Sequence, residues 1–221
     1  MAKQDRAIRT RQSILSAAAG VFEERGYQAA TISEILTAAD VTKGALYFHF
    51  PSKEHLAQGV LSQQDGETSI PRTCKVQQLV DMGMLHAYRL RSDPMVRAGV
   101  RLSLDQQAQG LDRSRPFTRW SEAIRDTLTA AREQGELLPH VTPHDTADVM
   151  VASFAGVQAM SQAVCDYQDL QRRISDLLRH LLPSVALSSV LASVDLTEGR
   201  GQKVFNELQE LRQQNPPATA D

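Results

Sequence analysis

The sequence predicts an all-α protein in which a small N-terminal helix-turn-helix domain precedes a larger helical domain. Apolar residues recur at intervals of three and four along most of the 221 residues, whereas few segments alternate with a period of two. Aromatic residues, which favour strands, make up only 5% of the chain. Residues 31–50 supply a third observation, because they form two short helical patterns joined by a tight turn.

The composition is that of a globular protein, with 42% hydrophobic and 23% charged residues. The formal net charge is −2, so nucleic-acid binding would require a local concentration of positive charge. The first eleven residues hold one, because Lys3, Arg6, Arg9 and Arg11 accompany a single acidic residue there. A basic arm can reach phosphates, although taken alone this segment is better explained as a solvated, frayed terminus.

Cys74 and Cys165 show no ligand spacing with each other or with histidine, so we expect reduced thiols and no zinc site. Charged residues stand where the apolar core of a secretory signal would begin. The longest apolar run, near residues 185–194, is too short to span a bilayer. We therefore expect a cytoplasmic protein without a membrane partner, a metal or a cofactor.

The first helix is predicted at residues 6–25, where apolar residues form a stripe at helical spacing: Ile14, Ala18, Val21 and Phe22. Gly26 follows at the position beyond a helix end that favours a left-handed conformation. We expect this helix to pack beneath the helix-turn-helix and to present its basic start to a DNA backbone.

The second helix begins at a capping box, in which the side chains of Thr31 and Glu34 each satisfy a free backbone donor. The run Ala39-Asp40-Val41 then interrupts the helical pattern. Thr42 is placed to cap a third, short helix directly after this turn.

The third helix has two faces of different chemistry. Leu46 and Phe50 lie four residues apart and are expected to point inward. Lys43 and Tyr47 are also four apart, on a different face. A helical pair with one apolar face and one Lys/Tyr face is what a helix-turn-helix requires.

A fourth helix links this unit to the rest of the chain. Pro51 ends the third helix, and Ser52 caps a new one that extends to about residue 64. Lys53 lies in its first turn, where it is either a phosphate contact or an ordinary surface lysine. We expect residues 1–51 to form the DNA-binding domain and 52–213 the ligand-binding and dimerisation domain, followed by a disordered tail at 214–221.

The larger domain should contain six more helices, at residues 74–91, 94–104, 117–134, 143–167, 169–182 and 198–213. The helix at 143–167 is apolar most of the way round, and the helix at 169–182 is strongly amphipathic. This surplus of apolar surface predicts a homodimer closed by a four-helix bundle. A deeper core within one subunit is the alternative.

The first 65 or so residues resemble the DNA-binding domain of the TetR family of bacterial transcriptional repressors. The stretches that carry the resemblance are ILSAAAGVFEERGYQAATISEIL and VTKGALYFHFPSKEHL. The rest resembles the γ-butyrolactone autoregulator receptors of actinobacteria, in VRAGVRLSLDQQAQGLDR, PFTRW, GELLPHV, FAGVQAMSQ and DYQDL. Asp40 replaces the glycine often found in the family turn; it tolerates left-handed geometry, and its charge should weaken DNA binding slightly.

The resemblance implies a homodimer on a pseudo-palindromic, double-stranded operator, with each third helix in a major groove. Lys43 is the candidate for base contact, because lysine donates to guanine O6 and N7. The remaining candidates are side chains that can donate hydrogen bonds to DNA phosphates, together with a glycine that lets the protein backbone approach the DNA closely. They are Thr42, Gly44, Tyr47, His49, Lys53 and Arg6. Base and phosphate roles are not separable from sequence, and for Tyr47 and His49 the alternative is packing between helices.

The larger domain should hold a mostly apolar pocket between its helices. Family resemblance places Trp120 at the site of a signalling lactone, whereas a plain core tryptophan would be favoured without it. Gln158 and Ser161 are polar residues on an apolar helix face, so each needs a partner or a ligand. Gln64 lies where the linking helix meets the larger domain, and it is the candidate for signalling ligand occupancy to the DNA-binding domain. The candidates for the apolar lining of the pocket are Val151, Phe154 and Met84.

These features together predict a repressor, not an enzyme, that releases its operator when a γ-butyrolactone-type molecule binds. One alternative is a TetR-type repressor or pseudo-receptor that answers to a butenolide or an antibiotic intermediate. An enzyme acting on a lactone is disfavoured because the six histidines are scattered and no Ser-His-Asp or Cys-His arrangement is present. A helical scaffold without DNA binding conflicts with the Lys43/Tyr47 face and the basic arm.

Overall fold

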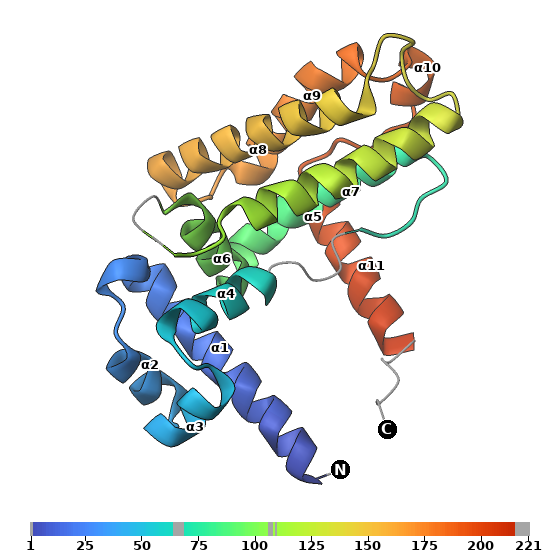
Figure 1. Ribbon diagram of the computed structural model, residues 1–221. Helices are drawn as coiled ribbons and strands as arrows, with labels where there is room; N and C mark the ends of the chain where they lie inside the picture. Colours follow the sequence, from blue (N-terminus) through green and yellow to red (C-terminus); the bar gives the residue numbers. More distant parts are fainter. Residues whose placement is uncertain (1, 64–68, 106–107, 109, 215–221) are drawn as a thin grey trace. The chain divides into compact units, whose positions relative to one another are not determined.

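The computed structural model describes residues 2–63, 69–105, 108 and 110–214, which fold into helices joined by short connections (Figure 1). Within these residues, strand-type pairing is limited to one isolated bridge between Leu137 and Ala186. The prediction of an all-α protein is confirmed. None of the helices described is long and apolar enough to cross a membrane.

The chain divides into two compact units. The first contains α1 (Ala2–Ala29), α2 (Ile32–Ala39), α3 (Lys43–His49), α4 (Lys53–Gln63) and α6 (Pro94–Leu104). The second contains α5 (Lys75–Ser92), α7 (Ser114–Glu133) from Thr118 onward, α8 (Pro143–Cys165), α9 (Leu170–Leu181), η1 (Leu182–Ser184), α10 (Ser188–Leu191) and α11 (Arg200–Gln214). These units reflect packing whereas the predicted domains divide the chain by function, so the boundary expected at residue 51 stays a prediction.

The core of the first unit forms around α1. Three of its predicted inward residues are completely buried: Ile14, Ala18 and Phe22. They pack in one cluster with residues of α2, α3, α4 and α6, among them Ile35, Leu46, Leu56 and Leu102. Gly26 bends α1 near its end with a φ of +77°, a conformation that glycine adopts without a steric penalty. An ion pair of 2.5 Å between Arg97 and Glu23 fixes α6 against α1.

The second unit is assembled around α5, which packs against α9 and α11. α11 approaches α5 so closely that a Cβ on Gly201 would clash with the carbonyl group of Met84. On another part of α5, a Cβ on Gly83 would lie 3.6 Å from the ring of Phe154 in α8. Glycine at position 201 therefore permits a helix contact that a larger residue would prevent, whereas a Cβ at position 83 would make an ordinary van der Waals contact.

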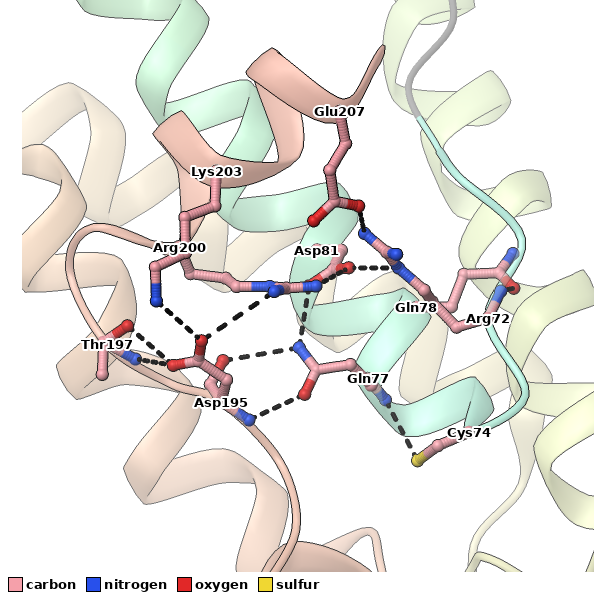
Figure 2. A network of polar contacts seen from close by, with 10 residues as sticks. All are labelled: Arg72, Cys74, Gln77, Gln78, Asp81, Asp195, Thr197, Arg200, Lys203 and Glu207. Atoms are coloured by element: carbon pink, nitrogen blue, oxygen red, sulfur yellow. Dashed lines mark hydrogen bonds and ion pairs between the residues drawn. The ribbon is translucent and has the colours of Figure 1, made fainter. Parts of the chain in front are cut away.

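A buried charge network joins α11 to α5 (Figure 2). The carboxylate of Asp81 is completely buried and accepts two hydrogen bonds from Arg200, at 2.7 and 2.6 Å. It also accepts one from Arg72 at 2.7 Å, and Arg72 pairs with Glu207 of α11 at 2.5 Å. Gln77 bridges Asp81 to the backbone of Asp195, so charged and polar groups on both sides of the interface are paired.

Candidate nucleic-acid interface and effector site

The helix-turn-helix has the caps that its sequence predicts. The Thr31 amide donates to the Glu34 carboxylate at 2.9 Å, and the Glu34 amide donates to the Thr31 hydroxyl at 3.2 Å. Asp40 adopts the left-handed conformation, with φ 51° and ψ 48°, and turns the chain toward α3. Thr42 then caps α3, because its hydroxyl oxygen accepts from the amide of Ala45 at 3.3 Å.

These caps leave one face of α3 open and bury the other. Leu46 and the C-cap residue Phe50 lie in the core, as expected. The exposed residues stand at helical positions that form one continuous patch, which we call the reading face: Lys43, Gly44, Tyr47 and Phe48. The ammonium group of Lys43 lies 5.9 Å from the Tyr47 ring centroid, so the predicted Lys/Tyr face exists.

The remaining DNA-binding candidates surround the reading face or support its unit. Thr42 is exposed, so its hydroxyl hydrogen can donate while its oxygen serves as the cap. His49 is half-buried and stacks edge-on against Phe48, with a centroid distance of 5.1 Å. Arg6 is exposed on a helical part of α1.

Lys53 has a structural role in the first unit. Its ammonium group donates to the carbonyl of Gln28 at 3.2 Å and lies 4.7 Å from the Tyr27 ring centroid. Partial burial lowers the pKa of Lys53, while nearby Glu54 and Glu34 favour its charged form. Burial and Glu54 raise the pKa of Tyr27 to about 12. An ammonium group has three donors, so these contacts still leave Lys53 able to meet a phosphate.

In the second unit, His86 stands at the centre of a polar-aromatic group that we call the His86 cluster: His86, Trp120, Phe154 and Gln158. The imidazole ring lies 5.0 Å from the Trp120 ring and 5.5 Å from the Phe154 ring, centroid to centroid. Its side chain also hydrogen-bonds to Gln158. Three residues from the predicted ligand site thus meet around a histidine of α5.

Burial controls the charge of His86, which is only 9% exposed. Desolvation, and secondarily the charge of Arg89, lowers the pKa of His86 to about 4, against an opposing contribution from Gln158. The imidazole is therefore neutral at pH 7 and offers one donor and one acceptor. Sequence reasoning missed His86; the available signal was a polar residue at helical spacing from the buried Leu79 and Met82.

The other predicted ligand residues fall into separate environments. Met84 is completely buried in α5, and Val151 is half-buried one turn before Phe154 in α8. Ser161 already has a partner within the chain, since its hydroxyl donates to Asp169 at 2.8 Å. Gln64 lies outside the described residues.

One side of α8 exposes apolar side chains: Val149, Met160 and Val164 are at least half exposed. A Cβ on Gly156, between them, would meet nothing within 4 Å. The main apolar residues of α9, by contrast, are buried within the unit: Leu170, Ile174 and Leu178. The surplus apolar surface expected of both helices is therefore concentrated on α8.

The described residues contain no group of three or more histidine, cysteine, aspartate or glutamate side chains placed to hold a metal ion.

Comparison with protein families gives two matches. Residues 14–60 match the family described as bacterial regulatory proteins, tetR family. Residues 75–186 match the tetracyclin repressor-like, C-terminal domain. The first match contains the complete helix-turn-helix, and the second contains every residue of the His86 cluster.

Individual relatives extend the similarity over nearly the whole chain. The A-factor receptor protein of Streptomyces griseus is 42% identical over 96% of this chain and 79% of its own length. The structure of TylP, a TetR regulator from Streptomyces fradiae, has a TM-score of 0.84 at 42% identity, covering 91% of this chain and 98% of that one. A γ-butyrolactone receptor structure has a TM-score of 0.66 at 28% identity, covering 93% and 99%.

Proposed function

Because the chain belongs to the TetR family of bacterial regulatory proteins, as a DNA-binding repressor related to the A-factor receptor, we propose that a small lactone controls its binding to an operator. The lactone is of the γ-butyrolactone type and occupies a site at the His86 cluster. The observation that carries this proposal is the buried, neutral imidazole between two aromatic rings. Binding there favours a dimer whose α3 helices do not fit successive major grooves.

The reading face supplies the contacts to DNA. Lys43 donates to the edge of a guanine, and Gly44, whose surroundings hold no side chain, allows close approach to the backbone. The phosphate contacts come from the hydroxyl, imidazole and cationic groups nearby: Thr42, Tyr47, His49, Lys53 and Arg6. Two copies would place their α3 helices about 34–36 Å apart on half-sites one helical turn apart.

The exposed apolar side of α8 supports dimer formation. A helix that exposes Val149, Met160 and Val164 loses the favourable free energy that burial of those side chains would give. TetR regulators typically act as dimers, and a second copy of the same face would cover this surface symmetrically. The paired α8 helices would then form the centre of the subunit contact.

The His86 cluster has the chemistry that an acyl lactone needs. The rings of Trp120 and Phe154 offer flat apolar walls for an alkyl chain. Gln158 raises the pKa of His86, as an acceptor of the imidazole N–H does, which leaves the second nitrogen of the neutral ring to accept a hydrogen bond from a ligand hydroxyl group. Because His86 carries no charge at pH 7, ligand entry does not require desolvation of an ion.

Operator release provides the test. The protein would be bound to DNA from upstream of its own gene, or to an operator selected in vitro, and titrated separately with a γ-butyrolactone and a butenolide. A coupling of about 1–3 kcal/mol predicts that saturating lactone weakens operator binding roughly 5–150-fold. If the operator complex survives saturating γ-butyrolactone but dissociates when butenolide is added, the effector belongs to the butenolide class and the proposed ligand class is wrong.

A matched pair of variants tests the location of the site. Trp120→Ala should bind the operator like the wild type but resist release, because one wall of the ligand site is missing. Phe205→Leu alters an aromatic side chain of α11 that stacks on Tyr88, outside the His86 cluster, and should release normally. Equal responses from the two variants would contradict the proposed ligand position.

A further inference from the structure

We propose that Phe48 recognises the 5-methyl group of a thymine in each operator half-site. The inference rests on the operator binding by α3 proposed above and adds a base-reading residue to it. It begins from an unusual exposure, since the Phe48 side chain is 81% exposed although phenylalanine normally lies in the core. Its neighbour Tyr47 is 40% exposed and ends in a polar hydroxyl group.

Exposure alone would carry little, because single apolar side chains are common on protein surfaces. The position of Phe48 adds the second observation. It stands one turn after Gly44 and directly after Tyr47, so it belongs to the reading face with Lys43. The opposite side of α3 is anchored in the core through Leu46, which prevents α3 from turning Phe48 inward.

The surroundings leave the ring accessible. The ring contacts His49, the last residue of α3, edge-on at 5.1 Å between centroids, and Phe48 nevertheless stays 81% exposed. On the Gly44 side, a Cβ would meet nothing within 4 Å, so the space beside the preceding turn is open. An approaching surface can therefore contact both the ring and the backbone of that turn.

The chemistry of the major groove then selects the partner. A phenyl ring has no hydrogen-bond donor, so it cannot satisfy a phosphate oxygen or a base acceptor. The base edges exposed in the major groove present hydrogen-bonding groups and one apolar group, the methyl group of thymine. Lys43 on the same face supplies the attraction to DNA that brings the ring to a base edge.

The experiment removes the methyl group and the ring separately. An operator would be selected from random DNA with the full-length protein, and each thymine would be replaced in turn by deoxyuridine. At one thymine position, which occurs in both half-sites, replacement in a single half-site should lower the affinity of the wild-type protein about fourfold, because one methyl group is no longer removed from water. Changing both half-sites should cost about 15-fold.

Phe48→Ala should bind the thymine operator more weakly and should not distinguish it from the deoxyuridine operator. Phe48→Leu retains an apolar contact and should keep part of the deoxyuridine penalty. Lys43→Ala is the matched control on the same face, and it should weaken binding but retain the full penalty. Both positions are exposed, and thermal unfolding with an unchanged midpoint would establish that the three variants are folded.

Two results would overturn the inference: no thymine sensitive to methyl removal, or the same deoxyuridine penalty in the wild type and Phe48→Ala. Both leave operator binding itself intact. Failure of the wild type to select any DNA sequence is a distinct result, since it would overturn the operator binding on which the role of Phe48 rests.

Discussion

The reading face and the His86 cluster are built in opposite ways. All residues of the reading face lie within one short helix, and the bonds that shape it join residues three apart, as in the Thr31 and Thr42 caps. The His86 cluster takes its side chains from α5, α7 and α8. One site is thus defined by local structure, and the other by the packing of helices that are far apart in the sequence.

This difference affects what holds each site in place. A cap stabilises its helix through one or two hydrogen bonds, so its loss should be felt mainly nearby. His86 keeps its position because α5 is held by α9 and α11, partly through the buried Asp81 network. Substitutions in the contacts of α5 with α9 and α11 should therefore disturb the effector site even when they are remote from the His86 cluster. The same substitutions should leave the reading face intact.

The largest effect is expected from Asp81→Asn. The substitution removes the charge that Arg200 and Arg72 share, while both guanidinium groups stay partly buried. Loss of one partner from such a network should lower the free energy of unfolding by about 3 kcal/mol. Urea unfolding followed by the fluorescence of Trp120, the single tryptophan, reports directly on the second unit.

Asp126→Asn is the matched control. Asp126 lies in α7, has a side chain that is 77% exposed, and pairs weakly with Arg125 at 3.7 Å. Its substitution should change the free energy of unfolding by no more than about 0.5 kcal/mol. Equal losses in the two variants would mean that the Asp81 network does not secure the second unit.

The same contrast explains what sequence reasoning could predict. The caps at Thr31 and Thr42, the left-handed Asp40 and the helix start at Pro94 depend on neighbouring residues, and each is found in the structure. The division of α3 into an inward face and a Lys/Tyr face leaves out Phe48. Its spacing of four residues from Gly44 is the sequence signal that places it beside the Lys/Tyr face.

Contacts between residues far apart in the sequence are harder to predict from the sequence. His86 gains its role from rings on α7 and α8, which periodicity within α5 cannot place. Ser161 hydrogen-bonds to Asp169 across a turn in which Asp166 and Tyr167 both have positive φ. Neither residue is a glycine, so the sequence does not indicate this turn. The short α10 lies in an apolar run without clear periodicity. Trp120 was placed through family resemblance, because its residue type alone is equally consistent with a core position.

A second, smaller effect should follow from the burial of His86. Its pKa in the folded protein, about 4, lies below the ordinary value of 6.5. The unfolded chain therefore binds a proton below about pH 6.5 that the folded chain does not bind until about pH 4. Stability from this group falls as the pH falls through that window, by roughly 2 kcal/mol between pH 7 and pH 5.

The comparison of wild type with His86→Gln isolates this contribution, because titration of other groups is common to both. The difference in unfolding free energy between the two proteins should shrink between pH 7 and pH 5 and stay constant between pH 8 and pH 7. A difference that is independent of pH would mean that the imidazole is not kept neutral by burial.

The smallest effect is expected from Thr31→Ala, which removes the hydroxyl half of the capping box at α2. The cost should be about 1 kcal/mol. It should be measurable as faster amide hydrogen exchange in α2, beginning at Glu34. Thr37→Ala is the control, because Thr37 is exposed and its hydroxyl donates to the carbonyl of Ser33 within the same helix. If Thr31→Ala also moved the Trp120 transition by the same free energy, the cap would stabilise both units, and the contrast between local and long-range control would not hold.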